Sequence, residues 1–116
     1  MRDFTKYEVW NEGIALAVKA YELTSVFPDE EKFGLVSQIR RSSVSISSNF
    51  AEGCSRTSEK DFKRFIEIAL GSSFEVKTQL IIAERLKYLK KELLDKFLAD
   101  LEKNARQLNA LRNKLK

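Results

Sequence analysis

Apolar residues recur every three or four positions along four segments of this chain, and this period predicts four amphipathic helices. We expect them over residues 6–26, 30–53, 59–89 and 91–114. The 116 residues include one Pro and four Gly, which favours a few long helices over many short strands. The pattern therefore predicts an all-α, antiparallel up-down four-helix bundle that forms a single domain, residues 1–116.

Local signals place the ends of these helices. Thr5 and Glu8 have the spacing of a capping box that starts the first helix, and Ser58 with Asp61 forms a weaker one for the third. Gly53 fits the C-terminal cap of the second helix. In the first helix, residues at four-and-three spacing share one face: Trp10, Ile14, Ala17, Tyr21 and Thr24.

The third predicted helix carries two apolar lines. One is an unbroken heptad seam: Phe62, Ile66, Ala69, Ser73, Val76, Leu80 and Ala83. The other consists of Leu70, Phe74, Ile81 and Tyr88. Phe74 and Val76 lie about 200° apart around a helix, so only one line can face the centre of the bundle. We expect the second line to be the interface of a homo-oligomer; the alternative is a wide core face covered by two helices of the same chain.

A polar stripe runs along the serine-rich second helix, beside its apolar positions. Its members at four-and-three spacing are Gln38, Ser42, Ser45, Asn49, Glu52 and Arg56. We expect a structural polar network that fixes helix register, because buried polar groups must be hydrogen-bonded. The residues assigned to it are Gln38, Ser45, Asn49 and Glu52, with Glu52 paired to an arginine. A polar pocket or a pore lining is the functional alternative.

Charge is distributed unevenly along the chain. The formal net charge is +4, but residues 1–39 carry −3, residues 40–64 carry +3, residues 65–84 carry −2 and residues 85–116 carry +6. One basic cluster spans the end of the second helix and the start of the third: Arg40, Arg41, Arg56, Lys60, Lys63 and Arg64. We expect these side chains to bind RNA or DNA, since lysine and arginine bind phosphates regardless of base sequence.

The alternative for this basic cluster is a solvated surface that supplies intersubunit ion pairs. No aromatic residue is interleaved with the cluster closely enough to indicate base stacking.

The composition argues against a catalytic site. Histidine is absent, which removes the commonest general base and metal ligand, and with it a di-iron site of the Glu-x-x-His type. No Gly-x-x-x-x-Gly-Lys phosphate loop occurs. We therefore expect no catalytic residues, no metal and no cofactor. Cys54 stands alone, so we expect a buried free thiol in a reducing compartment. With no membrane-length apolar run and no signal peptide, we expect a cytoplasmic protein without membrane contact.

Several segments resemble one known family. They are residues 38–53 (QIRRSSVSISSNFAEG), 62–65, 68–75 (IALGSSFE) and 78–80, together with Trp10, Tyr21, Phe27-Pro28, Phe33-Gly34-Leu35 and Tyr88. The chain closely resembles the bacterial "four helix bundle protein" family, also called the ribosomal-RNA intervening-sequence protein family. Some members are encoded inside intervening sequences of large-subunit ribosomal RNA genes. Ser47 stands where that family very often has Pro, so we expect a straighter second helix here.

The resemblance implies a ring-like homo-oligomer, typically a homopentamer. It also implies a relation to the accessory variability proteins of diversity-generating retroelements, which are basic pentameric bundles that bind a reverse transcriptase and nucleic acid. We therefore expect a non-enzymatic homo-oligomeric bundle that binds RNA or DNA non-specifically through basic faces. The alternative is a protein-interaction adaptor, for example for a reverse transcriptase or another encoded partner.

Overall fold

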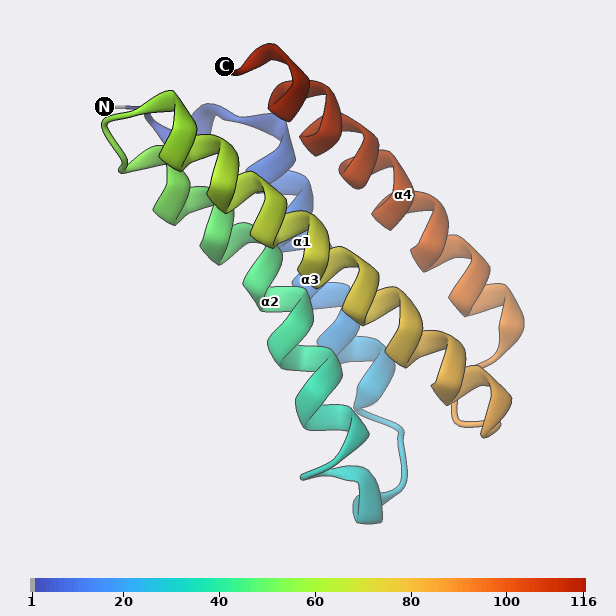
Figure 1. The fold of residues 1–116 in the computed structure, drawn as a ribbon. Helices are drawn as coiled ribbons and strands as arrows, with labels where there is room; N and C mark the ends of the chain where they lie inside the picture. Colours follow the sequence, from blue (N-terminus) through green and yellow to red (C-terminus); the bar gives the residue numbers. More distant parts are fainter. Residues whose placement is uncertain (1) are drawn as a thin grey trace.

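The computed structural model describes residues 2–116 as four long helices packed side by side (Figure 1). α1 spans Glu8–Thr24, α2 spans Leu35–Cys54, α3 spans Glu59–Arg85 and α4 spans Lys91–Lys114. Two short 3-10 turns precede α1 and α2: η1 (Phe4–Lys6) and η2 (Asp29–Glu31). Each helix contacts the next along the chain, and α4 returns to α1. The predicted all-α four-helix fold is confirmed, and residues 2–116 contain no strand.

The core is built from one apolar line of each helix. In α3 it is the predicted heptad seam, whose seven residues are all buried. α2 contributes Ile39, Ile46 and Phe50, and α4 contributes Leu101 and Leu108. At about 25 cal/mol per Å² of buried apolar surface, this shared core is the main force that holds the helices together.

The observed helix boundaries differ from the predicted ones where no local signal marks them. α4 has the predicted bounds, but α2 begins at Leu35 because residues 29–31 form η2 instead. α3 ends at Arg85, four residues earlier than predicted. Lys87 there adopts a left-handed φ of 67°, and the Tyr88 N–H donates to the Ala83 carbonyl. This is a Schellman ending made without its usual glycine, which is why the sequence did not reveal it.

Of the three predicted caps, one is confirmed. The Ser58 hydroxyl accepts from the Asp61 N–H at 3.1 Å, as expected for the start of α3. The prediction for Thr5 is wrong: Asp3 caps η1 by accepting from the Thr5 N–H, and α1 begins later, at Glu8. The prediction for Gly53 is also wrong, because Gly53 lies inside α2 and has no positive φ.

Small residues allow neighbouring helices to approach α2 closely. A Cβ on Gly53 would lie 2.7 Å from the Cβ of Phe65, so α2 and α3 could not pack this way around any larger residue. A Cβ on Gly13 would collide with the Ser47 hydroxyl at the contact of α1 with α2. Ser47 is buried there, and α2 runs unbroken through it.

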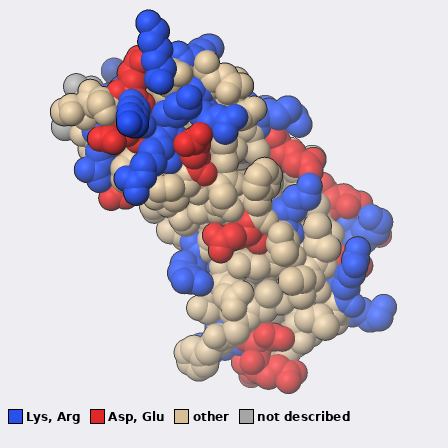
Figure 2. All heavy atoms as spheres, in the orientation of Figure 1, with Lys and Arg blue, Asp and Glu red and all other residues tan. Residues whose placement is uncertain are grey.

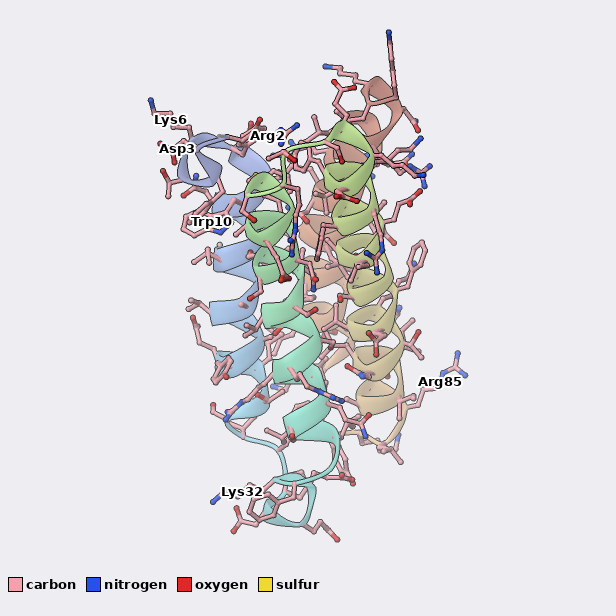
Figure 3. All side chains as sticks on the ribbon, turned by 60° about the vertical axis from the view of Figure 1, so that its left-hand side comes forward. Arg2, Asp3, Lys6, Trp10, Lys32 and Arg85 are labelled. Carbon is pink, nitrogen blue, oxygen red and sulfur yellow. The ribbon has the colours of Figure 1, made fainter. Side chains whose placement is uncertain are left out.

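Most of the Trp10 line of α1 lies at the edge of the core: Thr24 is buried and Trp10 is partly buried, but the middle of the line is exposed. The core side of this helix is formed by Val9, Leu16, Ala20 and Leu23, whereas Ile14 is 41% and Tyr21 is 46% exposed. With its neighbours the line borders a shallow groove that we call the α1/α2 face: Phe4, Trp10, Ile14, Ala17, Val18, Tyr21, Val44, Ser47, Ser48 and Ala51. Figure 3 shows Trp10 near the end of the bundle that holds Arg2 and Lys6, with Lys32 at the other end. The face has no charged member.

Candidate nucleic-acid interface

The six cations predicted as one cluster fall into two groups. Arg40 and Arg41 lie in the first half of α2, whereas Arg56 follows its last turn. Fourteen residues of helix, about 21 Å, separate Arg40 from Cys54, where α2 ends. The structure therefore brings together four of the six, where α2 ends and α3 begins: Arg56, Lys60, Lys63 and Arg64.

Further cations reach the same place from both ends of the chain. We call it the basic end and define it by residues 2–6, 52–64 and 112–116, which hold nine Lys or Arg and four Asp or Glu. Arg2 Nη1 donates to the Arg56 carbonyl at 2.9 Å, and the Lys116 N–H donates to Glu59 at 3.4 Å. Figure 2 shows blue side chains gathered at this upper end of the molecule. These terminal cations could not be predicted as part of the cluster, because they are far from residues 40–64 in the chain.

Aromatic rings support the arginines of the basic end. The guanidinium carbon of Arg56 lies 4.8 Å from the ring centroid of Phe65, and that of Arg64 lies 5.9 Å from it. Arg2 lies 4.2 Å from the ring of Phe62. Such stacking holds the planar guanidinium groups in place while their N–H groups stay available. Arginines cover the rings of Phe62 and Phe65, so these two rings offer no free face to a base, in line with the expectation that no aromatic of this cluster indicates base stacking.

The cations of the basic end differ in how they are paired. Arg56 forms a 3.5 Å ion pair with Glu52, one helical turn earlier. Lys60, Lys63 and Arg64 have no ion pair within residues 2–116. A phosphate oxygen would therefore meet these three side chains without first displacing a carboxylate.

Arg40, in contrast, serves to join α1 and α2. Its Nε donates to Thr24 Oγ1 at 2.9 Å, its Nη2 donates to the Tyr21 carbonyl at 3.4 Å, and its guanidinium lies 4.4 Å from the Tyr21 ring. Arg41, next to it, is exposed. These contacts favour a structural role for Arg40.

The polar stripe of α2 lies along the contact with α3. Asn49 Nδ2 donates to the carbonyl and the hydroxyl of Ser45 at 2.9 and 2.7 Å. Ser72 of α3 donates to the Ser45 hydroxyl at 2.8 Å, and Ser42 donates to Gln79 of α3 at 2.7 Å. The network therefore includes two α3 residues that sequence reasoning missed.

Two of the four residues assigned to that network lie outside it. Gln38 is exposed and contributes only its carbonyl, which accepts from the Ser42 hydroxyl. Glu52 is exposed and forms the surface pair with Arg56, a kind of pair that contributes little to stability. Both side chains are exposed, so water can satisfy their polar groups.

The second apolar line of α3 is not a free surface. Leu70, Ile81 and Tyr88 are partly buried and pack against the core of the same chain. Tyr88 also donates to Glu31 at 3.0 Å and lies 5.6 Å from the Phe27 ring. Only Phe74 of this line is exposed, at 68%. The wide core face that the sequence left as an alternative accounts for the other three residues.

Comparison with known proteins assigns the family. The family described as "23S rRNA-intervening sequence protein" matches residues 5–110. This chain belongs to that family. No curated protein matches it. The 1.70 Å crystal structure of a protein with unknown function from the S23 ribosomal protein family of Bacteroides thetaiotaomicron VPI-5482 is similar, with a TM-score of 0.81. It is 24% identical over 90% of this chain and 97% of the other, which shows a shared fold.

Few other groups in residues 2–116 suggest chemistry. Cys54 is fully buried, and burial raises the pKa of its thiol to about 11; Arg2 opposes this shift and Asp3 adds to it. Residues 2–116 hold no group of three His, Cys, Asp or Glu side chains arranged for a metal ion. None of the helices described for the same residues is long and apolar enough to cross a membrane.

Proposed function

We propose that this chain is a non-enzymatic, homo-oligomeric bundle that binds RNA or DNA without sequence specificity through its basic end. The observation that carries the proposal is the convergence of three chain segments, which gathers nine cations at one end. Phosphate contacts from such a surface release counterions, so the affinity would depend steeply on salt. The exposed or half-buried Lys60, Lys63 and Arg64 are the principal contacts in this proposal.

A charge-matched pair of variants tests the binding proposal. We expect Lys60→Gln/Lys63→Gln/Arg64→Gln to lower affinity for a single-stranded RNA at least ten-fold in filter binding at low salt. Three lost phosphate contacts on a single strand also reduce the slope of log affinity against log salt by about 2.1. The control is Lys87→Gln/Lys90→Gln/Lys96→Gln, which removes the same charge from exposed residues near the other end of α4. Wild-type protein that retains neither RNA nor DNA at low salt would refute the proposal.

The α1/α2 face supports the oligomeric part of the proposal. Ile14, Val18, Tyr21 and Val44 are 41 to 56% exposed and adjoin one another, and exposed apolar groups that adjoin in this way mark interaction sites. We assign a second copy of the chain to this face.

A different exposed apolar line offers that copy its counterpart. Ile68, Ile82 and Leu86, the last directly after α3, are 39 to 49% exposed. Helical spacing places Ile68 beside Ser72 and Ile82 beside Gln79, and both Ser72 and Gln79 form hydrogen bonds with α2. A contact between two different faces is heterologous. These two faces lie on either side of α2, so successive copies would turn relative to one another, which favours a closed ring over a straight filament. This pairing is our proposal for the ring-like homo-oligomer.

Light scattering tests the oligomer. We expect a mass above that of the monomer at micromolar concentration, and a shift toward monomer for Val18→Glu. The control is Val26→Glu: Val26 is 80% exposed but lies outside both faces. A monomer mass for the wild type would contradict this part of the proposal and leave nucleic-acid binding to its own test.

A protein-interaction adaptor is the second candidate function. Phe33 is 89% exposed beside the acidic η2 turn, at the end opposite the basic end, and belongs to neither self-association face. A reverse transcriptase or another encoded protein is the kind of partner we consider here. Co-purification followed by nuclease treatment separates the candidates, because only a directly bound protein survives the nuclease.

A further inference from the structure

An exposed aromatic ring lies in a groove between α3 and α4. Phe74 is 68% exposed in the middle of α3, and next to it Gly71 has open space where a Cβ would be. The groove has a volume of about 560 Å³, and α4 contributes Ala105, Arg106 and Asn109 to it. A flat ligand can therefore approach the ring over Gly71 without meeting another side chain there.

The charges around this groove favour an anionic ligand. Arg106 is exposed and has no ion pair within residues 2–116. Glu67, the carboxylate that lines the groove, is already bound to Arg112 at 3.6 Å. Among the residues that line the groove, the unpaired charge is therefore positive, and Asn109 adds hydrogen-bonding groups.

The groove is continuous with the basic end. Lys63, Glu67, Leu70 and Phe74 follow the four-and-three spacing, so they share one line along α3. Eleven residues of helix place Phe74 about 16 Å from Lys63. Arg112, in the last turn of α4, lies beside the same line. A nucleic-acid backbone that enters at Lys63 can therefore follow cations along α4 as far as the exposed ring.

We infer that Phe74 is a stacking platform for a base of single-stranded nucleic acid, with Arg106 and Arg112 contacting the flanking phosphates. The inference rests on the proposed function and narrows it to one class of ligand. A base needs a free face to stack on the ring; single strands offer one, whereas the faces of duplex bases are covered by their neighbours. A second copy is the weaker candidate, since a symmetric contact would bring Arg106 and Arg112 close to their own copies.

Fluorescence anisotropy with a labelled oligouridylate and a labelled duplex of equal length tests the inference. We expect Phe74→Ala to lower single-strand affinity about ten-fold and leave duplex affinity unchanged, and Phe74→Trp to retain it. The control is Phe33→Ala, which removes an even more exposed ring at the far end and should change neither affinity.

The other outcomes of these measurements would contradict the stacking role of Phe74. An equal loss for both ligands, or no loss for either, overturns the stacking role. A lower mass of Phe74→Ala in light scattering overturns it in favour of self-association. If the single strand binds and only Lys60→Gln/Lys63→Gln/Arg64→Gln weakens it, this inference fails and the proposed function stands. If the wild type binds neither ligand, both fail.

Discussion

Gly53 of α2 lies so close to Phe65 of α3 that an added Cβ would be 2.7 Å from the Cβ of the phenylalanine. Phe62, one turn earlier on α3, would be 3.1 Å away through its Cδ1. Both neighbours would have to move, and Phe62 is itself fully buried in the core. The α2–α3 contact next to the basic end therefore depends on the absence of a side chain at residue 53.

The first prediction concerns this contact. Gly53→Ala should lower the free energy of unfolding by about 1–3 kcal/mol, the usual cost of overpacking a core, as measured by urea denaturation. Gly71→Ala is the matched control within a helix. An added Cβ there meets no atom of another element within 4 Å, so the free energy of unfolding should rise by about 0.5–1 kcal/mol. A neutral Gly53→Ala would show that α2 and α3 can separate freely there.

The second prediction concerns the polar contact between α2 and α3. Asn49→Leu removes both hydrogen bonds to Ser45 and should lower the free energy of unfolding by about 1 kcal/mol. Ser48→Ala, on the exposed side of α2, should change it little. If Asn49→Leu alters neither stability nor the mass in light scattering, the network has no structural role.

The third prediction concerns Tyr88, which joins the turn after α3 to η2. Its hydrogen bond to Glu31 raises the pKa of the phenol, with further contributions from burial and from the charges of Glu31 and Glu30. The contribution of this bond to stability should therefore be complete below the ordinary tyrosine pKa. It should be lost as pH rises through the higher pKa of Tyr88 in the folded protein.

Tyr88→Phe tests this link. We expect a lower urea midpoint at neutral pH. An ultraviolet pH titration should show one phenol fewer, and the missing phenol should be the one with the raised pKa. Tyr21→Phe is the control, since no hydrogen bond of the Tyr21 hydroxyl occurs among the described residues. Equal titration curves for wild type and Tyr88→Phe, after correction for one phenol, would contradict the assignment.

The fourth prediction concerns the reactivity of Cys54. Cys54 is fully buried, so the native protein should react with a thiol reagent at pH 8 only as fast as it unfolds, and fully in urea. Burial also raises the pKa of this thiol from 9.0 to about 11, which keeps the native thiolate fraction low. The unfolded thiol ionises first, so its contribution to stability is complete below pH 9 and is lost as pH rises toward 11. In urea midpoints measured over a pH series, Cys54→Ala should not show this loss of stability between pH 9 and 11. Rapid native labelling at pH 8 would show that the thiol is accessible.

The candidate site could be predicted only in part from the sequence. Lys60, Lys63 and Arg64 fall within two turns of one helix, so helical spacing alone placed them together. Arg40 was grouped with them because it is near in the sequence, but 1.5 Å of rise per residue moves it to another part of the bundle. Arg2 and Lys116 could not be assigned to the site, since only the packed bundle brings the chain ends beside α3.

The chain by itself determines four helices, because apolar periodicity and the Ser58 cap act within a few residues of each other. It also determines the core line of α3, where the heptad seam is unbroken. Only the tertiary structure decided which line of α1 is buried. The Val9 and Trp10 lines both have helical spacing, and the positions of α2 and α4 place Leu16 inside and leave Ile14 on the surface. The same packing left Phe74 exposed while it covered Leu70 and Ile81, since a helix fixes only the direction of a side chain and its neighbours fix what it contacts.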